Sequence, residues 1–291
     1  MKDHLVRIVT KTGNLRGIAC SATSLVKEAC RRHRTSPTAS VALGRALAGG
    51  ALMGALVKGD QRVALKFEGS GPIRKILVEA QADGAVCGYV GNPEADLPPS
   101  ENRFDVPGLL GRAGLLTVTK DLRLKEPYSG TVELLTSEIG EDLAYYMTES
   151  EQIPSAVGLG VLLGKDLEVA TAGGFLVQAL PPTEEAEIEG VTSRIAGLSS
   201  IAEMAGRENG PEEILEHLFR DLPFEVLEER PVFFQCRCSV QRMKEALVAL
   251  GPKEIASLSQ ERQAIEVRCE FCGETYQFST EDLKSLGEPW H

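Results

Sequence analysis

The chain has 291 residues, of which 43% are hydrophobic and 25% are charged, a composition typical of a soluble globular protein. Seven cysteines in this length are too few for a secreted disulfide scaffold, and residues 1–10 lack the apolar run of a secretory signal. The most apolar stretch, 39–57, is rich in Ala and Gly and contains Arg45, so we expect no membrane span. These features predict a cytoplasmic protein whose thiols stay reduced.

The net charge of −11 is concentrated in one segment. Residues 1–183 carry 20 basic and 20 acidic side chains, residues 184–230 carry 4 and 13, and residues 231–291 carry 7 and 9. A protein that binds nucleic acid through its phosphates needs a basic face. The composition therefore argues against a nucleic-acid partner, and it sets residues 184–230 apart from the rest of the chain.

Residues 1–182 predict a sheet-dominated α+β domain. Alternating apolar residues bounded by turn residues indicate strands, and helix-start signals or apolar residues at helical spacing indicate helices. The expected strands are 5–9, 15–20, 63–67, 73–81, 85–90, 115–120, 131–135, 157–163, 167–172 and 175–180. The expected helices are 21–32, 36–57 and 138–150, with a polar, proline-rich loop over 92–107. The pair Gly173-Gly174 is expected to turn the chain between the last two strands.

The acidic segment, residues 183–231, follows Pro181-Pro182, which cannot continue a sheet ladder. Apolar residues at helical spacing predict two amphipathic helices here, separated at Asn209-Gly210-Pro211. Each helix would have an apolar face that needs a partner and an acidic outer face. Crowded like charges lower helix stability by roughly 0.2–0.5 kcal/mol per pair. A segment that folds only when docked and an ordinary pair of interdomain helices both remain open.

Residues 232–291 predict a small C-terminal module. Ser239 is expected to begin a helix that ends at Gly251-Pro252. A short helix is then expected over 253–260, strands over 264–268 and 275–278, and a last helix from Thr280. A module of this length with few large apolar side chains has a marginal core, for which a bound metal is the usual remedy.

Four of the seven cysteines form two close pairs, Cys236-Arg-Cys238 and Cys269-Glu-Phe-Cys272. Two close pairs separated by a longer segment are the spacing of a tetrahedral four-thiolate zinc site. We therefore predict that Cys236, Cys238, Cys269 and Cys272 bind one Zn²⁺ per chain, with Gly273 allowing a tight turn. Four thiolates leave no position for a catalytic water, and no other catalytic constellation stands out, so we expect no enzyme activity.

Oxidation offers a way to release such a metal. A zinc-bound thiolate can be oxidised to a sulfenic acid and then to a disulfide, which no longer binds zinc. Proximity along the chain would pair Cys236 with Cys238 and Cys269 with Cys272. A Cys-x-Cys disulfide is strained and easily reduced again, which suits a reversible sensor. From these residues alone, a constitutive zinc ribbon that never oxidises remains the alternative.

The other cysteines and the histidines do not indicate a site. Cys20, Cys30 and Cys87 are expected to be buried and to pack as small apolar side chains. The four histidines do not cluster with any cysteine in the sequence.

With these motifs in place, the chain resembles the redox-regulated heat-shock chaperones of the 33 kDa class, the 33 kDa chaperonin family, over essentially its whole length. The likeness rests on the runs 131–147, 150–157 and 173–181 and on both cysteine pairs. Ser137 stands where the family more often has glycine.

The resemblance implies an ATP-independent holdase that is inactive while reduced and zinc-bound. Oxidation would form the two disulfides, release zinc, and unfold first the C-terminal module and then the linker. The active form would be a homodimer that protects unfolding or oxidatively damaged proteins from aggregation. The domains would be a substrate-binding and dimerisation domain at 1–182, a metastable linker at 183–231 and a zinc-binding redox-switch domain at 232–291. Exposed apolar surface is a means of binding unfolded chains.

Two other functions remain open from the sequence. A zinc ribbon that binds RNA or a translation component would need a basic face, which residues 231–291 do not offer by composition. A thiol oxidoreductase acting through Cys269 and Cys272 would turn over a disulfide substrate, whereas a holdase acts stoichiometrically.

Overall fold

The computed structural model describes residues 2–99, 103–251, 254–255, 257 and 264–287, with side chains up to residue 283. The chain divides into two compact units, Met1–Gln235 (unit 1) and Cys236–His291 (unit 2). The fold is a sheet-rich α+β fold, which confirms the predicted class. Among the residues described, no helix is both long and apolar enough to cross a membrane.

Unit 1 contains two sheets. The five-stranded sheet has the order β10-β1-β2-β9-β8, and the six-stranded sheet has the order β11-β5-β4-β3-β6-β7. Neighbouring strands are antiparallel except β11 and β5, which are parallel. The bounds are β1 His4–Thr10, β2 Leu15–Ser21, β3 Arg62–Gly69, β4 Lys75–Gln81, β5 Ala85–Val90, β6 Gly114–Asp121, β7 Tyr128–Glu133, β8 Ser155–Leu163, β9 Val169–Ala179, β10 Phe224–Pro231 and β11 Phe233–Phe234.

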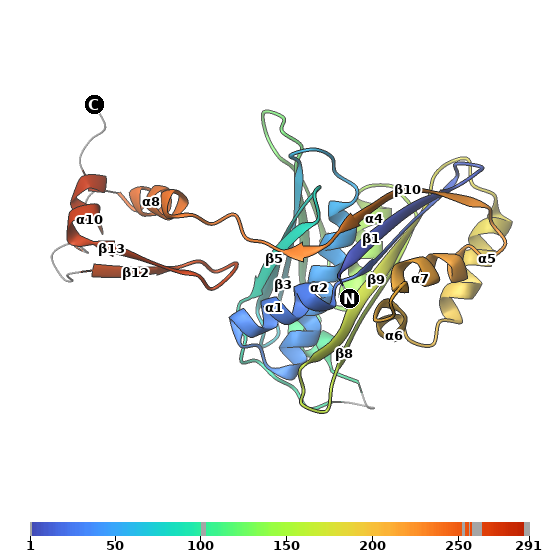
Figure 1. Ribbon diagram of the computed structural model, residues 1–291, viewed down its shortest axis with the longest axis horizontal. Helices are drawn as coiled ribbons and strands as arrows, with labels where there is room; N and C mark the ends of the chain where they lie inside the picture. Colours follow the sequence, from blue (N-terminus) through green and yellow to red (C-terminus); the bar gives the residue numbers. More distant parts are fainter. Residues whose placement is uncertain (1, 100–102, 252–253, 256, 258–263, 288–291) are drawn as a thin grey trace. The chain divides into compact units, whose positions relative to one another are not determined.

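The long helix α2 (Pro37–Gly54) lies between the two sheets and is almost completely buried (Figure 1). As predicted, Ser36 begins it: the Ser36 hydroxyl accepts a hydrogen bond from the backbone N–H of Ala39 at 3.2 Å. A helix without a polar face is stable only when it is surrounded by apolar partners. Gly50 allows Val78 to approach, since an added Cβ would come within 2.5 Å of the Val78 side chain. This close packing forms the main core of the protein.

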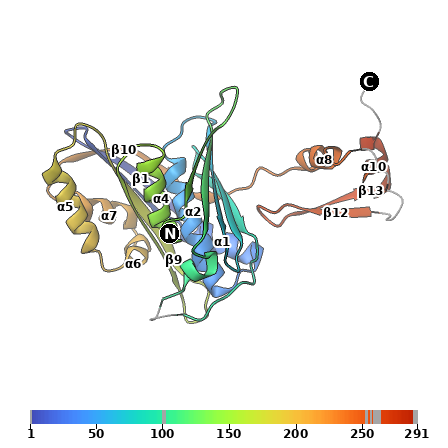
Figure 2. The same ribbon diagram turned by 180° about the vertical axis from the view of Figure 1, so that it is seen from behind.

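Three shorter helices complete this core: α1 Thr23–His33, α3 Val106–Leu110 and α4 Ile139–Glu149. Helix α4 lies beside α2 (Figure 2). Ser137, just before α4, has a φ of 64°, a conformation in which glycine has no steric penalty. Its hydroxyl donates to the Gly111 carbonyl oxygen at 2.6 Å, an interaction that glycine could not make. The residue that departs from the family pattern thus gains a hydrogen bond at a strained position.

The predicted turn at Gly173-Gly174 was wrong, because residues 169–179 form one continuous strand, β9. This strand pairs with β2 on one side and with β8 on the other. A Cβ on Gly173 would lie 2.3 Å from the Cys20 carbonyl oxygen, and one on Gly174 would lie 2.5 Å from the Gly158 carbonyl oxygen. The two glycines therefore permit close packing inside the sheet and do not end a strand.

The acidic segment also differs from the prediction of two helices. It forms three helices, α5 Glu185–Ala196, α6 Ile201–Ala205 and α7 Gly210–Leu218, and then the strand β10. The first expected helix is interrupted after Gly197, and Ser200 begins α6 by accepting a hydrogen bond from the Glu203 N–H at 3.3 Å. The last part of the segment pairs with β1 along the edge of the five-stranded sheet. Pairing with a distant strand thus outweighed the local pattern.

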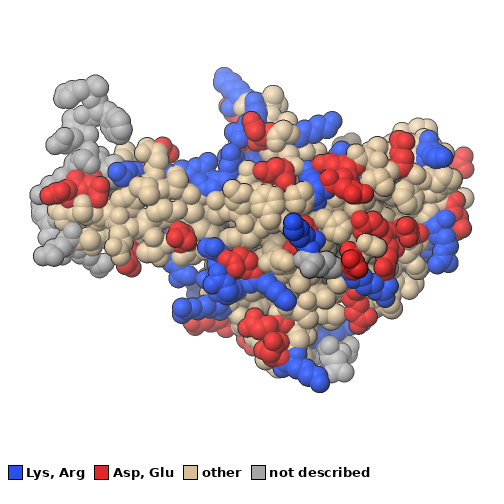
Figure 3. Space-filling model, viewed as in Figure 1, with Lys and Arg blue, Asp and Glu red and all other residues tan. Residues whose placement is uncertain are grey.

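Helices α5–α7 cover the face of the five-stranded sheet that is turned away from α2 (Figure 1). The apolar residues buried between them form a second core, here called the covered face: Val6, Ile8, Leu15, Ala19, Phe175, Val177, Val191, Ala205, Ile214, Leu215, Leu218 and Phe219. Gly17 makes room for this packing, since an added Cβ would lie 2.7 Å from the Phe219 ring. On the outside, acidic side chains gather over the region of β10 and α7 (Figure 3).

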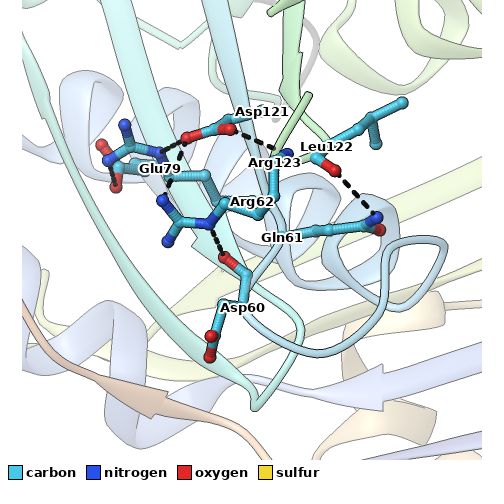
Figure 4. Close-up of polar contacts among 7 residues, drawn as sticks. All are labelled: Asp60, Gln61, Arg62, Glu79, Asp121, Leu122 and Arg123. Carbon is cyan, nitrogen blue, oxygen red and sulfur yellow. Dashed lines mark hydrogen bonds and ion pairs between the residues drawn. The ribbon is translucent and has the colours of Figure 1, made fainter. Parts of the chain in front are cut away.

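The outer face of the six-stranded sheet is polar. Arg62 of β3 bonds to Glu79 of β4 and to Asp121 of β6, at 3.1 Å in each case (Figure 4). The hydroxyl groups of Thr117 and Thr131 lie 3.1 Å apart across β6 and β7. A polar sheet face can remain in contact with water, whereas the apolar face under α5–α7 needs its cover.

Unit 2 contains α8 Val240–Val248, β12 Ala264–Arg268, β13 Thr275–Ser279 and α10 Thr280–Gly287. As predicted, the Ser239 hydroxyl begins α8 by accepting a hydrogen bond from the Arg242 N–H at 3.2 Å. The helix expected over 253–260 lies largely outside the described residues. The described core is small and consists of Leu247, Ile255, Ile265, Phe278 and Leu283. A core of this size rarely stabilises a fold by itself.

Candidate metal centre

Unit 2 brings four cysteine sulfur atoms together. Cys236 and Cys238 precede α8, and Cys269 and Cys272 lie in the turn between β12 and β13. The Sγ atoms of Cys236 and Cys269 are 3.7 Å apart, and those of Cys238 and Cys272 are 3.3 Å apart. All four sulfur atoms lie within 4.8 Å of one another. The structure thus gathers all four residues that the spacing had singled out.

These separations suit a single metal ion. In a tetrahedral site with zinc–sulfur bonds of about 2.3 Å, neighbouring sulfur atoms are about 3.8 Å apart. The four cysteines are free thiols, two of them buried and two half-buried. In the described part of the chain, no other group of three or more Cys, His, Asp or Glu residues has the geometry to hold a metal. The cluster could therefore hold a metal ion, and its all-sulfur donor set fits zinc.

The thiols themselves favour a cation at the centre. Burial raises the pKa of Cys269 to about 11, and it is also the main cause that raises the pKa of Cys272. For Cys238, burial acts in the same direction, but hydrogen bonds led by the Tyr276 hydroxyl lower its pKa below the ordinary value. Without a cation, the thiols of Cys269 and Cys272 would therefore stay protonated near pH 7. A divalent metal reverses this balance, because it binds thiolates.

The turn from Cys269 to Glu274 directs backbone amides toward sulfur. The Gly273 N–H donates to the Cys269 carbonyl oxygen, and the Cys269 N–H donates to the Glu274 carbonyl oxygen, both at 2.8 Å. Gly273 has a φ of 73°, as expected for a tight turn. The backbone N–H groups of Cys272 and Phe271 oppose the effect of burial on the pKa of Cys269. Amides placed in this way stabilise a thiolate.

Tyr276 is a residue of the site that the sequence reasoning missed. Its hydroxyl donates a hydrogen bond to the Cys238 Sγ at 3.0 Å from strand β13. Such outer contacts orient a metal ligand and tune its affinity. One feature of the sequence could have indicated its role. Side chains alternate between the two faces of a strand, so Tyr276 lies on the same face of β13 as the buried Phe278.

The remaining candidates take no part in the cluster. Cys20, Cys30 and Cys87 are buried in unit 1, which confirms the prediction. His4 contacts Glu212 of α7 at 3.1 Å, and His291 lies outside the described residues.

Comparisons with known proteins agree on one class of protein, a molecular chaperone that is not an enzyme. Residues 3–279 match the family model described as Hsp33 protein. The chain therefore belongs to the Hsp33 family.

The similarity extends over the whole chain. This chain is 55% identical over 284 residues to the 33 kDa chaperonin of Geobacter sulfurreducens, and the aligned region covers 98% of this chain and 94% of that protein. It is 44% identical to the 33 kDa chaperonin of Geobacillus kaustophilus, with 98% of each chain covered. The crystal structure of the 33 kDa chaperonin from Thermotoga maritima matches with a TM-score of 0.91 and 37% identity, again over 98% of each chain. The family resemblance predicted from the motifs is confirmed.

Proposed function

We propose that this protein is a redox-regulated, ATP-independent holdase that is inactive while it is reduced and zinc-bound. The observation that supports the proposal is the four-thiol cluster in a unit whose apolar core, over the residues described, is small; a core of this size rarely stabilises a fold by itself. Zn²⁺ held by Cys236, Cys238, Cys269 and Cys272 would supply the missing stability, about 10–16 kcal/mol in small modules. Whatever removes the ion would then unfold unit 2.

Oxidation is the proposed trigger. Two thiolates lose two electrons to hydrogen peroxide, whose O–O bond breaks; with two protons, the products are one disulfide and two water molecules. We propose the pairs Cys236 with Cys238 and Cys269 with Cys272, because these residues stay close along the chain after the metal has left. The shortest separations given above, 3.7 and 3.3 Å, run between the two pairs. The geometry of the reduced cluster is therefore not the reason for this pairing.

The proposed response lies in residues 183–231, a metastable linker between a domain at 1–182 and a redox-switch domain at 232–291. Its helices bury the covered face. Their polar contacts include Glu187 with Asn14, in the turn between β1 and β2, at 2.5 Å, and Glu212 with His4 of β1 at 3.1 Å. Release of this acidic segment would expose apolar surface to which unfolding proteins bind. We further propose a cytoplasmic location, a homodimer after oxidation, and non-native proteins as partners in place of nucleic acid or membrane.

The test compares reduced, zinc-loaded protein with protein treated with peroxide under mild heat. A chromogenic chelator should register one zinc ion released per chain, and light scattering should show that only the oxidised form suppresses aggregation of a thermally unfolding client. Oxidised protein that fails to suppress aggregation would refute the holdase. Binding to RNA with a steep salt dependence would instead favour the RNA-binding alternative.

A further inference from the structure

Three small residues follow one another along the face of β8 that is turned toward α5–α7. Ala156, Gly158 and Gly160 share this face because side chains alternate along a strand. Neighbouring side chains and α6 already fill the space at two of these positions. A Cβ added to Gly158 would lie 2.4 Å from the Phe175 ring, and a Cβ added to Gly160 would lie 2.6 Å from the nitrogen of the α6 residue Ala202. The third position, Ala156, is only half-buried and lines a cavity.

This cavity, here called the α5 cavity, has a volume of about 160 Å³ and lies between α5 and the sheet. Apolar side chains of β2, β9 and α5 line it, among them Leu15, Val177 and Val191 of the covered face. Ile188 of α5 also lines the cavity and is 40% exposed, so the cavity opens to solvent beside this residue. The packing of α5 on the sheet therefore leaves an apolar space that a small molecule can enter.

The lining of the α5 cavity argues against water and against ions as its occupant. Within the described part of the chain, the cavity is lined by no charged side chain and by two hydroxyl side chains, Ser155 and Thr192. The Ser155 hydroxyl already donates to the Ile153 carbonyl oxygen at 2.8 Å and accepts from the Gln178 side chain at 3.3 Å. A buried water needs about two to four polar partners, which these side chains do not supply. The occupant that fits is therefore uncharged and apolar.

The volume of the α5 cavity selects the size of this occupant. An engineered apolar cavity of about 150 Å³ holds a single benzene ring. A long acyl chain exceeds this volume. Its carboxylate would also lie at the acidic start of α5, where Ile188 stands between Glu187 and Glu189 in the sequence. A single uncharged ring therefore matches both the volume and the charge of the cavity.

We propose that the α5 cavity binds an uncharged molecule that has a single aromatic ring. The ring contacts apolar side chains of α5 on one side and those of β2 and β9 on the other, and burial of its apolar surface supplies the binding free energy. The inference goes beyond the proposed function and does not depend on it, because the cavity is present while α5 is packed on the sheet.

A bound ring stabilises the packing of α5. Because both the helix and the sheet line the cavity, the ligand binds only while α5 is docked. A ligand that binds one state alone favours that state by a factor of one plus the ratio of free ligand concentration to Kd. At a ligand concentration of about three times Kd, local opening of α5 should therefore be about fourfold rarer.

The test uses reduced, full-length protein and fluorobenzene, whose fluorine NMR signal shifts and broadens on binding. Ala156→Leu should fill the cavity from the β8 side. Ala186→Leu is the matched control, because Ala186 is exposed on α5 and does not line the cavity. A second variant, Ile195→Ala, removes part of the lining and should bind the larger probe 1-fluoro-3,5-dimethylbenzene more tightly than wild type does.

Fluorobenzene should bind saturably to wild type and to Ala186→Leu, and about tenfold more weakly to Ala156→Leu. The charged analogue 4-fluorobenzoate should bind wild type about tenfold more weakly than fluorobenzene does. Limited proteolysis between residues 184 and 197 should slow about fourfold at three times Kd. Absence of saturable binding to wild type would overturn the inference, as would equal binding by wild type and Ala156→Leu or equal binding of the two probes. If an unfolded polypeptide displaces fluorobenzene from the reduced protein, the cavity takes a protein side chain and the inference is also lost.

Discussion

The main core of unit 1 and the core of unit 2 are stabilised in different ways. In unit 1, two sheets enclose the almost wholly buried helix α2. In unit 2, a few apolar side chains pack next to four cysteines. Small domains bury too little surface to be stable without help, and a structural zinc site contributes about 10–16 kcal/mol against a whole-domain stability of about 5–15 kcal/mol. Under the proposed function, thiol oxidation would therefore unfold unit 2 and leave the main core of unit 1 folded.

Between these extremes is the covered face under α5–α7. Its apolar residues are as well buried as those of the main core, but its helices carry most of the net negative charge of the chain. Hydrophobic burial stabilises the packing of α5–α7 on the sheet, and repulsion among their like charges opposes it. The stability of this region should therefore be lower than that of the main core.

The largest effect is expected from loss of the metal. Cys269→Ser, or treatment of wild type with a strong chelator, should remove amide protection throughout unit 2, because the small core cannot offset the lost coordination energy of about 10–16 kcal/mol. Hydrogen exchange read by mass spectrometry would show this, with α2 remaining protected. Cys87→Ala, in unit 1, is the control and should keep its zinc. Unchanged protection of unit 2 in Cys269→Ser would mean that its fold does not depend on the cluster.

A smaller effect is expected from a cavity in the main core. Leu47 of α2 is fully buried, so Leu47→Ala should lower the free energy of unfolding of unit 1 by about 2–5 kcal/mol. Urea unfolding followed by circular dichroism measures this, while zinc content should stay at the wild-type value. The exposed Leu124→Ala should change stability by at most about 0.5 kcal/mol. Loss of zinc in Leu47→Ala would contradict the independence of the two cores.

Weakening the packing of the covered face should lower stability by less than a cavity in the main core. Leu218 of α7 is buried against the sheet, and Leu218→Ala should cost about 2 kcal/mol, near the lower limit for such changes, because the helices can open locally. Limited proteolysis should then cut faster between residues 184 and 222 in reduced, zinc-loaded protein. Glu216→Ala, exposed on the same helix, should digest like wild type. If both variants resist protease equally, the segment is held by contacts other than the covered face.

The smallest effect is expected at the outer contact of the metal centre. Tyr276→Phe removes the hydrogen bond to Cys238 and should cost about 0.5–1.5 kcal/mol, seen as roughly two- to tenfold weaker zinc binding. Competition with a chelator of known affinity measures the change. Tyr128→Phe, in unit 1, serves as the control. Wild-type affinity in Tyr276→Phe would show that the hydroxyl group does not support the cluster.

Features that depend on neighbouring residues in the sequence were predicted correctly. Ser36 and Ser239 begin helices because a hydroxyl group reaches an N–H three residues ahead, and the cysteine spacings indicated one cluster because each pair lies close together in the chain. Features that depend on residues far apart in the sequence were not predicted. Gly173 and Gly174 suggested a turn because their neighbours in β2 and β8 are far away in the sequence. Tyr276 was missed for the same reason, since Cys238 precedes it by 38 residues.

The sequence alone determined the α+β class, the four thiols and the acidic segment, because composition, capping and ligand spacing are local properties. Only the tertiary structure decided that the end of this segment is strand β10 and that α5–α7 cover an apolar sheet face. A strand's pairing and the cover of a sheet face depend on which distant residues meet, and burial of apolar surface selects that arrangement over local preference.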